Sequence, residues 1–146
     1  MSGGTGTELS KDADKIKLAR GKGVWLTRQN PERPIYLVGE ATTDAATSEL
    51  EAATSKKTWN IVASPSVEPI DLNAKVATTD ENDQILVPTK GAPKNFTIKD
   101  GKWGYDKKVL GEDGLYHSVR TEEDATIPAG RGFWYINSTG KTSIGL

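Results

Sequence analysis

The stretch Ile-Pro-Ala-Gly-Arg-Gly-Phe-Trp-Tyr-Ile, at residues 127–136, indicates the fold class of this chain. An apolar residue leads into Gly-basic-Gly and an aromatic run follows, which is typical of a strand, a tight turn and a second strand. A degenerate copy, Leu-Ala-Arg-Gly-Lys-Gly-Val-Trp-Leu-Thr, stands at residues 18–27. The copies share six positions, namely Gly, basic, Gly, apolar, Trp and apolar. They predict a repeated packing unit in a β-rich domain.

The composition of the 146-residue chain agrees with an all-β fold. Its 15 glycines and 7 prolines, with many Thr and Ser, separate short runs of β-branched and aromatic residues. We expect an antiparallel β-sandwich or partly open barrel of about ten short strands, with at most one short helix.

One domain is predicted at residues 15–146, preceded by a polar, glycine-rich arm at residues 1–14 that we expect to be disordered. The motif copies divide this domain. Residues 15–39 form a half-unit that holds the first copy, and residues 58–146 form a full unit that ends with the second.

Residues 40–57 allow two interpretations, because their composition shifts to Ala, Thr, Ser and Glu. They form either a linker or a short helix capped by Thr43 or Asp44. The run that follows, residues 58–65, is a strand candidate whose nearly continuous apolar centre favours a central place in the sheet.

Two hairpins are predicted between residues 95 and 119. The dipeptide Asp100-Gly101, which is favoured in a type I′ turn, joins strands at 95–98 and 102–105. A second turn at 111–114 joins residues 107–110 to residues 115–119.

The four tryptophans are expected to differ in burial. Trp25, Trp59 and Trp134 sit in apolar strands and are predicted to be buried, whereas Trp103 is flanked by lysine and glycine and is predicted to be partly exposed.

Aromatic residues of the hairpins form the candidate ligand-binding site. Trp103 and Tyr105 share one face of a strand because side chains alternate, and Tyr116 stands on the neighbouring strand. Sugar rings stack on exposed aromatic faces, so Trp103, Tyr105 and Tyr116 would suit a carbohydrate. Core packing of the same rings is the alternative.

The order of a Trp-Asn-Ile-Val strand at residues 59–62, two hairpins and Pro-Ala-Gly-Arg-Gly-Phe-Trp at residues 128–134 resembles a repeat of large secreted bacterial surface proteins. This resemblance covers about 60% of the chain, and its motifs specify packing rather than chemistry. The chain is also similar in general character to small secreted proteins of mucin-foraging gut bacteria, some of which are described as aspartic-type acid proteases.

These resemblances imply a secreted or surface-exposed bacterial module that binds a glycoprotein such as mucin or has a structural role. The first alternative is an acid protease of the aspartic type that degrades mucin. The second is an assembly subunit of a surface structure, built through exposed edge strands.

An aspartic protease needs two carboxyl groups that share a proton. The chain contains neither Asp-Thr-Gly nor Asp-Ser-Gly, and its Asp-Gly pairs at 100–101 and 113–114 fall at predicted turns. A catalytic pair would have to be brought together by folding from Asp80, Asp83, Asp100, Asp106, Asp113 and Asp124.

Other signals of chemistry are incomplete. His117 is the single histidine, and the sequence has no Gly-x-Ser-x-Gly elbow that would present a serine nucleophile to it. Residues 137–142 resemble the end of a phosphate-binding loop but lack its first glycine and its helix. Residues 80–84 have the ligand spacing of a calcium loop without its glycine and distal glutamate. We therefore expect no cofactor and no metal.

Charge and targeting signals limit the classes of partner and the locations that the sequence favours. There are 19 basic and 20 acidic residues, which gives a net charge of −1, and no block of like charges suits a nucleic acid. The sequence has no cysteine and no apolar run of the roughly 18 residues that a membrane span needs. We expect a monomer that is secreted or at the cell surface, with a cytoplasmic location as the alternative.

Overall fold

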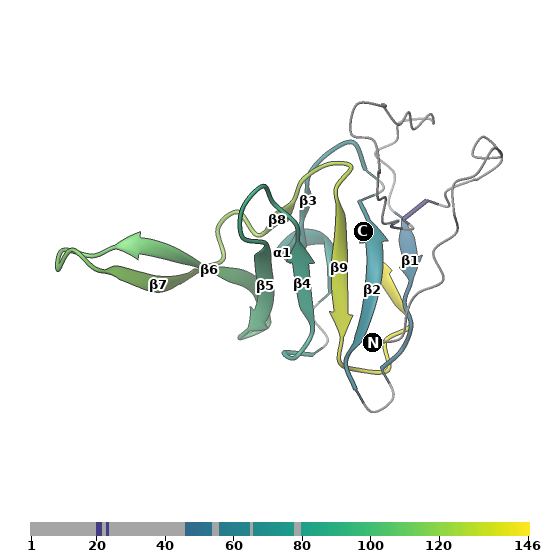
Figure 1. The fold of residues 1–146 in the computed structure, drawn as a ribbon. Coiled ribbons are helices and arrows are strands. Elements are labelled where there is room, and N and C mark those ends of the chain that lie inside the picture. Colours follow the sequence, from purple (N-terminus) through teal and green to yellow (C-terminus); the bar gives the residue numbers. More distant parts are fainter. Residues whose placement is uncertain (1–19, 22, 24–45, 54–55, 65, 78–79) are drawn as a thin grey trace, which may run out of the picture.

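A computed structural model describes residues 20–21, 23, 46–53, 56–64, 66–77 and 80–146 (Figure 1). This part of the chain contains ten short strands in antiparallel sheets and one helix of 4 residues, and none of its sheets closes into a barrel. The predicted all-β fold with at most one short helix is therefore confirmed. The arm at 1–14 and most of the half-unit at 15–39 lie outside the described residues.

The main sheet has six strands, each antiparallel to its neighbours. Their order is β2 (Thr58–Ala63), β9 (Gly132–Asn137), β4 (Gln84–Val87), β5 (Lys94–Lys99), β6 (Lys102–Leu110) and β7 (Tyr116–Thr121). Two small antiparallel sheets complete the fold, β1 (Thr47–Glu49) with β10 (Ser143–Gly145), and β3 (Ile70–Asp71) with β8 (Thr126–Ile127).

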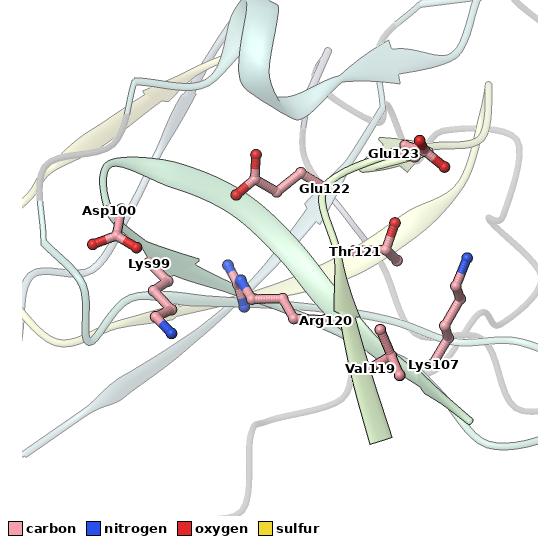
Figure 2. Close-up of a pocket in the computed structure, with 8 residues that line it drawn as sticks. All are labelled: Lys99, Asp100, Lys107, Val119, Arg120, Thr121, Glu122 and Glu123. Carbon is pink, nitrogen blue, oxygen red and sulfur yellow. The ribbon is translucent and has the colours of Figure 1, made fainter. Parts of the chain in front are cut away.

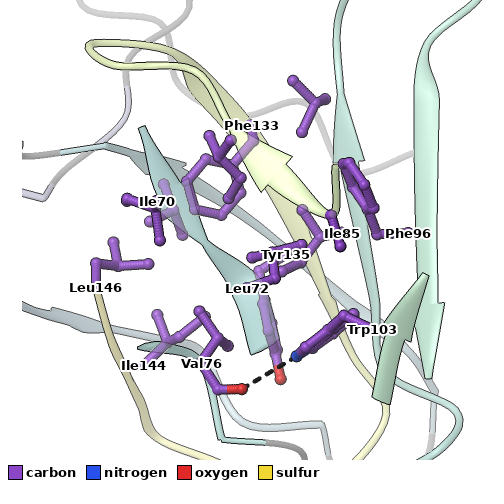
Figure 3. Packing of buried hydrophobic residues seen from close by; sticks show 14 of the residues in the cluster. Ile70, Leu72, Val76, Ile85, Phe96, Trp103, Phe133, Tyr135, Ile144 and Leu146 are labelled. Carbon is purple, nitrogen blue, oxygen red and sulfur yellow. Dashed lines mark hydrogen bonds between the residues drawn. The ribbon is translucent and has the colours of Figure 1, made fainter. Parts of the chain in front are cut away.

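The core lies between one face of the main sheet and a layer made by the small sheets and helix α1 (Leu72–Lys75). Figure 3 shows the buried side chains packed there. Asp71 caps α1 by accepting hydrogen bonds from the backbone N–H groups of Asn73 and Ala74 at 2.9 and 3.2 Å. The buried side chains between the two layers include Leu72, Ile85, Phe96, Trp103, Ile127, Phe133, Tyr135 and Ile144.

The second motif copy forms the predicted strand, turn and strand. Strand β8 ends at Ile127, Gly130 has a φ of +62°, and β9 begins at Gly132. Only Arg20, Gly21 and Gly23 of the first copy lie within the described residues.

The first hairpin also follows its turn chemistry. Asp100 and Gly101 have φ values of +52° and +73°, as a type I′ turn requires, and Lys99 pairs with Lys102. The second hairpin is confirmed as well. The predicted strands at 102–105 and 107–110 are one continuous strand, β6, of 9 residues.

Two element predictions are wrong. The helix alternative for residues 40–57 fails at Thr47–Glu49, which form β1 and pair with β10 near the other end of the chain. Strand β2 is not central, because it stands at the end of the main sheet among the described residues. Its outer edge contacts Gly21 and Gly23, through Ala63 N–H to Gly21 O at 3.1 Å and Gly23 N–H to Ile61 O at 3.3 Å.

The tryptophan predictions need correction. Trp103 has 0% of its surface exposed and Trp59 has 58%, the reverse of what we expected, and Trp134 is only partly buried. Trp25 lies outside the described residues. Trp103 points into the core, where its indole N–H donates to Val76 O at 3.1 Å. Trp59 is on the other face of the main sheet, opposite Ile136.

Candidate functional site: the β6–β7 arm

The distal part of the β6–β7 hairpin, residues 106–120, projects from the body of the protein and is called the arm here (Figure 1). Strand β5 pairs with β6 only between Lys102 and Gly104, so beyond that point β6 has β7 as its strand neighbour. A two-stranded ribbon is at best marginally stable in water. The arm therefore depends on its attachment to the sheet.

Arg120 provides much of that attachment. Its guanidinium donates to Thr97 Oγ1 at 2.9 Å, to Thr97 O at 3.0 Å and to Lys102 O at 3.2 Å. Gly104 leaves the room for this contact, because a Cβ atom there would lie 2.7 Å from Thr121 O and 3.1 Å from Arg120 Nη2. The base of the arm is thus tied to β5 by its backbone and by this arginine.

Tyr105 also belongs to the base. Its ring packs edge-to-face on Phe96, with 5.4 Å between the ring centroids, and Lys94 Nζ lies 4.3 Å from the Tyr105 centroid. Half-buried in this way, Tyr105 is part of the packing between β5 and β6.

The far end of the arm exposes large apolar side chains. Leu110 and Tyr116 are paired directly across the two strands, and Leu115 precedes Tyr116 in the loop. Their exposed fractions are 59%, 71% and 63% respectively. We call Leu110, Leu115 and Tyr116 the tip patch. Behind it, Val109 and Val119 are exposed on the opposite face of the ribbon.

The loop that carries the tip patch is held by its own hydrogen bonds. His117 Nε2 lies 3.0 and 2.9 Å from the two carboxylate oxygens of Asp113, which also accepts the Leu115 N–H at 3.0 Å. The hydrogen bond with His117, followed by that with Leu115, lowers the pKa of Asp113. Gly111 N–H donates to Leu115 O at 2.7 Å, and Gly114 has a φ of +75°. The loop conformation is therefore fixed before any partner binds.

The three residues predicted as a ligand-binding platform do not converge. Trp103 is buried in the core, Tyr105 is at the base of the arm, and Tyr116 is at its tip. In the strand register Tyr105 pairs with Thr121, whereas Tyr116 pairs with Leu110, five positions further along β6. Of the predicted residues only Tyr116 is well exposed, and it lies beside two leucines that the sequence interpretation did not select.

A groove of about 480 Å³ lies at the base of the arm, between the type I′ turn and the end of β7 (Figure 2). Charged side chains of both signs dominate its lining, which comprises Lys99, Asp100, Lys107, Val119, Arg120, Thr121, Glu122 and Glu123. Glu122 pairs with Lys102 at 3.3 Å, and Arg120 is bound to backbone and threonine oxygens. These contacts give the groove a structural role at the foot of the arm.

No two of the six aspartates that could form a protease pair share a hydrogen bond between their carboxyl groups. Asp83 is fully buried and accepts hydrogen bonds from Tyr135 Oη at 2.6 Å, Ser138 N at 2.8 Å and Ser138 Oγ at 2.7 Å. Asp80 accepts from the backbone and side-chain nitrogens of Asn82. The other four aspartates are exposed, namely Asp100, Asp106, Asp113 and Asp124.

The calcium-loop spacing at residues 80–84 has a structural explanation. The carboxylate of Asp83 points inward to Tyr135 and Ser138, and joins the start of β4 to the end of β9. The described residues contain no group of three or more His, Asp or Glu side chains that would hold a metal ion.

The environment of Tyr135 predicts how the stability of the protein changes at alkaline pH. Burial, with the hydrogen bond and the charge of Asp83, raises the pKa of Tyr135 well above its usual value of 10.0. Its contribution to stability is complete below pH 10.0 and decreases as the pH rises further, because the tyrosine of the unfolded chain ionises first. We expect the free energy of unfolding to fall above that pH, and to fall less in Tyr135→Phe. Simultaneous ionisation of all four tyrosines in the folded protein, followed by ultraviolet absorbance, would contradict this.

Comparison of the chain with protein-family models, with curated proteins and with solved structures found no match. In the described part, no helix is long and apolar enough to span a membrane.

Proposed function

We propose that this protein is a secreted or surface-exposed bacterial module that binds a macromolecular partner through the tip patch of the β6–β7 arm. A mucin-type glycoprotein is the partner we put first. The observation that carries the proposal is the exposure of Leu110, Leu115 and Tyr116 together at the end of a projecting arm. The extracellular setting rests on the sequence resemblance.

Contact between exposed apolar side chains and water is unfavourable in free energy, and packing against a partner would remove this cost. Five of the eight large apolar side chains that are exposed in the described part belong to the arm. Contiguous apolar patches with a polar rim are typical of interaction sites, and tyrosine is enriched in them. The arm thus has the composition of a contact surface.

The chemistry of the tip suits a glycoprotein. The Tyr116 ring offers a face on which a sugar can stack, and the two leucines offer contact to a peptide backbone and its apolar side chains. On the ribbon face opposite Leu110 and Tyr116, His117 pairs with Asp113 and offers hydrogen-bonding groups to hydroxyls at the end of the arm. Because the loop is already fixed, little entropy is lost when it binds.

The test is binding to immobilised mucin, before and after enzymatic removal of its glycans. We compare the wild-type chain with a triple variant, Leu110→Ser with Leu115→Ser and Tyr116→Ser. The matched control is Val67→Ser, which replaces an exposed apolar side chain outside the arm. The triple variant should lose affinity at least about tenfold and the control should not.

The two mucin samples separate the contributions of sugar and protein. Loss of binding on deglycosylation would assign the contact to the glycan. Retained binding that still needs the tip patch would assign it to the polypeptide. If the wild-type chain bound neither sample, or if the triple variant bound like the control, the proposed function would be wrong.

A further inference from the structure

The two ends of the main sheet differ in how their edges are covered. At one end, β2 exchanges backbone hydrogen bonds with Gly21 and Gly23 of the same chain. At the other end, β7 has β6 as its only strand neighbour among the described residues. The outer edge of β7 therefore presents a row of backbone N–H and C=O groups that pair with no strand in the described part of the chain.

This edge lacks several of the features by which natural proteins prevent pairing. Strand β7 reads Tyr-His-Ser-Val-Arg-Thr, without proline or lysine, and its register with β6 is unbroken from Tyr116 to Thr121. Its arginine, Arg120, is directed across β6 to Thr97 and Lys102. The guanidinium of Arg120 is therefore engaged by its own chain.

We propose that β7 pairs antiparallel with β7 of a second copy of this chain, so that β6 and β7 of both copies form one four-stranded ribbon. This inference goes beyond the proposed function, because it concerns the backbone edge of β7 and a second copy of the chain, not a glycoprotein. It also replaces the monomer that we expect from the sequence. A net charge of −1 on each copy gives little repulsion between them.

The geometry of a two-fold pair restricts the register. Outward-pointing backbone groups alternate along a strand, so the axis must pass through a residue and not between two. Ser118 and Val119 are the two central residues of β7. An axis at Ser118 sets Tyr116 opposite Arg120 of the second copy and His117 opposite Val119.

An axis at Val119 instead joins the two valines and sets Ser118 opposite Arg120 of the second copy. Neither register brings two arginines together, and both bury apolar surface of Val119, which is exposed in the single copy. The edge of β7 is thus compatible with a second copy of itself in either register. Leu110 and Leu115 of the tip patch lie outside the paired strand, whereas Tyr116 is its first residue.

The absence of cysteine from the sequence permits a direct test. Ser118→Cys and Val119→Cys each introduce a single thiol at one of the two axis positions. Ser143→Cys, at an exposed serine of β10, is the control for random collision. Under mild oxidation one of the two β7 variants should form a disulfide-linked dimer at least about tenfold faster than the control, because paired strands bring Cα atoms within disulfide range.

Sedimentation over a wide range of protein concentration provides the second measurement. The wild-type chain and Val109→Lys should show a growing dimer fraction, whereas Val119→Lys should remain monomeric. Val109 and Val119 are similarly exposed on the same face of the arm, but only Val119 is on the β7 edge.

Three results would each overturn the inference: a wild-type monomer at every concentration, cross-linking of both β7 variants no faster than Ser143→Cys, or an undiminished dimer in Val119→Lys. Mucin binding can succeed or fail independently of all of them. The two proposals are therefore judged by separate readouts.

Discussion

Replacing Trp103 with alanine is expected to lower the free energy of unfolding by about 3–5 kcal/mol, as for other large-to-small changes at buried aromatic residues. Trp103 is fully buried and packs in the centre of the core. The replacement removes its ring, leaves a cavity and deprives Val76 O of its indole donor. The backbone of Trp103 is also bonded to the side chain of Asn73, so the cavity opens beside helix α1.

The matched control is Trp59→Ala, which changes the same residue type on the outer face of the sheet. Trp59 is mostly exposed, so its loss should cost about 1 kcal/mol or less. Urea unfolding followed by far-ultraviolet circular dichroism measures both variants without relying on tryptophan fluorescence. If Trp59→Ala destabilised the protein as much as Trp103→Ala, the assignment of the core face would be wrong.

Replacing Asp83 with alanine is expected to cost about 3 kcal/mol, although the residue is small and polar. The carboxylate accepts from the hydroxyl of Tyr135 and from two donors of Ser138. Alanine leaves the buried Tyr135 hydroxyl and the part-buried Ser138 donors without this acceptor. The start of β4 would lose its polar connection to the end of β9.

Asp106→Ala serves as the control for charge. Asp106 is exposed in the arm, and its loss should change the free energy of unfolding by about 0.5 kcal/mol or less. Urea unfolding at constant ionic strength compares the two variants. A similar small effect for both would contradict the buried role of Asp83.

Turn chemistry could be predicted from the sequence because it is local. Asp100-Gly101 adopts the positive φ values that its residue types favour, and Gly130 does the same between β8 and β9. The strands on either side of these turns followed from alternation and apolar runs. The all-β class depends on such local signals.

The direction of the strand faces could not be predicted from the same signals. Lys102 and Gly104, which suggested an exposed Trp103, are its neighbours in a strand and therefore point to the opposite face. Gly104 indeed lies under Arg120 on that other face. The period of two separates the faces but does not identify which one meets the second layer.

Pairing between segments that are far apart in the sequence could not be predicted either. Thr47–Glu49 becomes a strand because it meets β10, and nothing in its own composition signals this. The arm likewise results from unequal strand lengths, since β6 has 9 residues and β5 only 6. The flanks of the Gly111–Gly114 turn, with leucine on both sides and Tyr116 next to it, were the available signal for the tip patch.

The most direct test of the tip patch as the binding surface is a nuclear magnetic resonance titration of the full chain with a mucin O-glycopeptide. We predict that the backbone amide shifts concentrate at residues 110–117, with the amides of β2 and β9 unchanged. Shifts that were centred on the outer face of β2 and β9, or no shifts at all at saturating glycopeptide, would contradict the account.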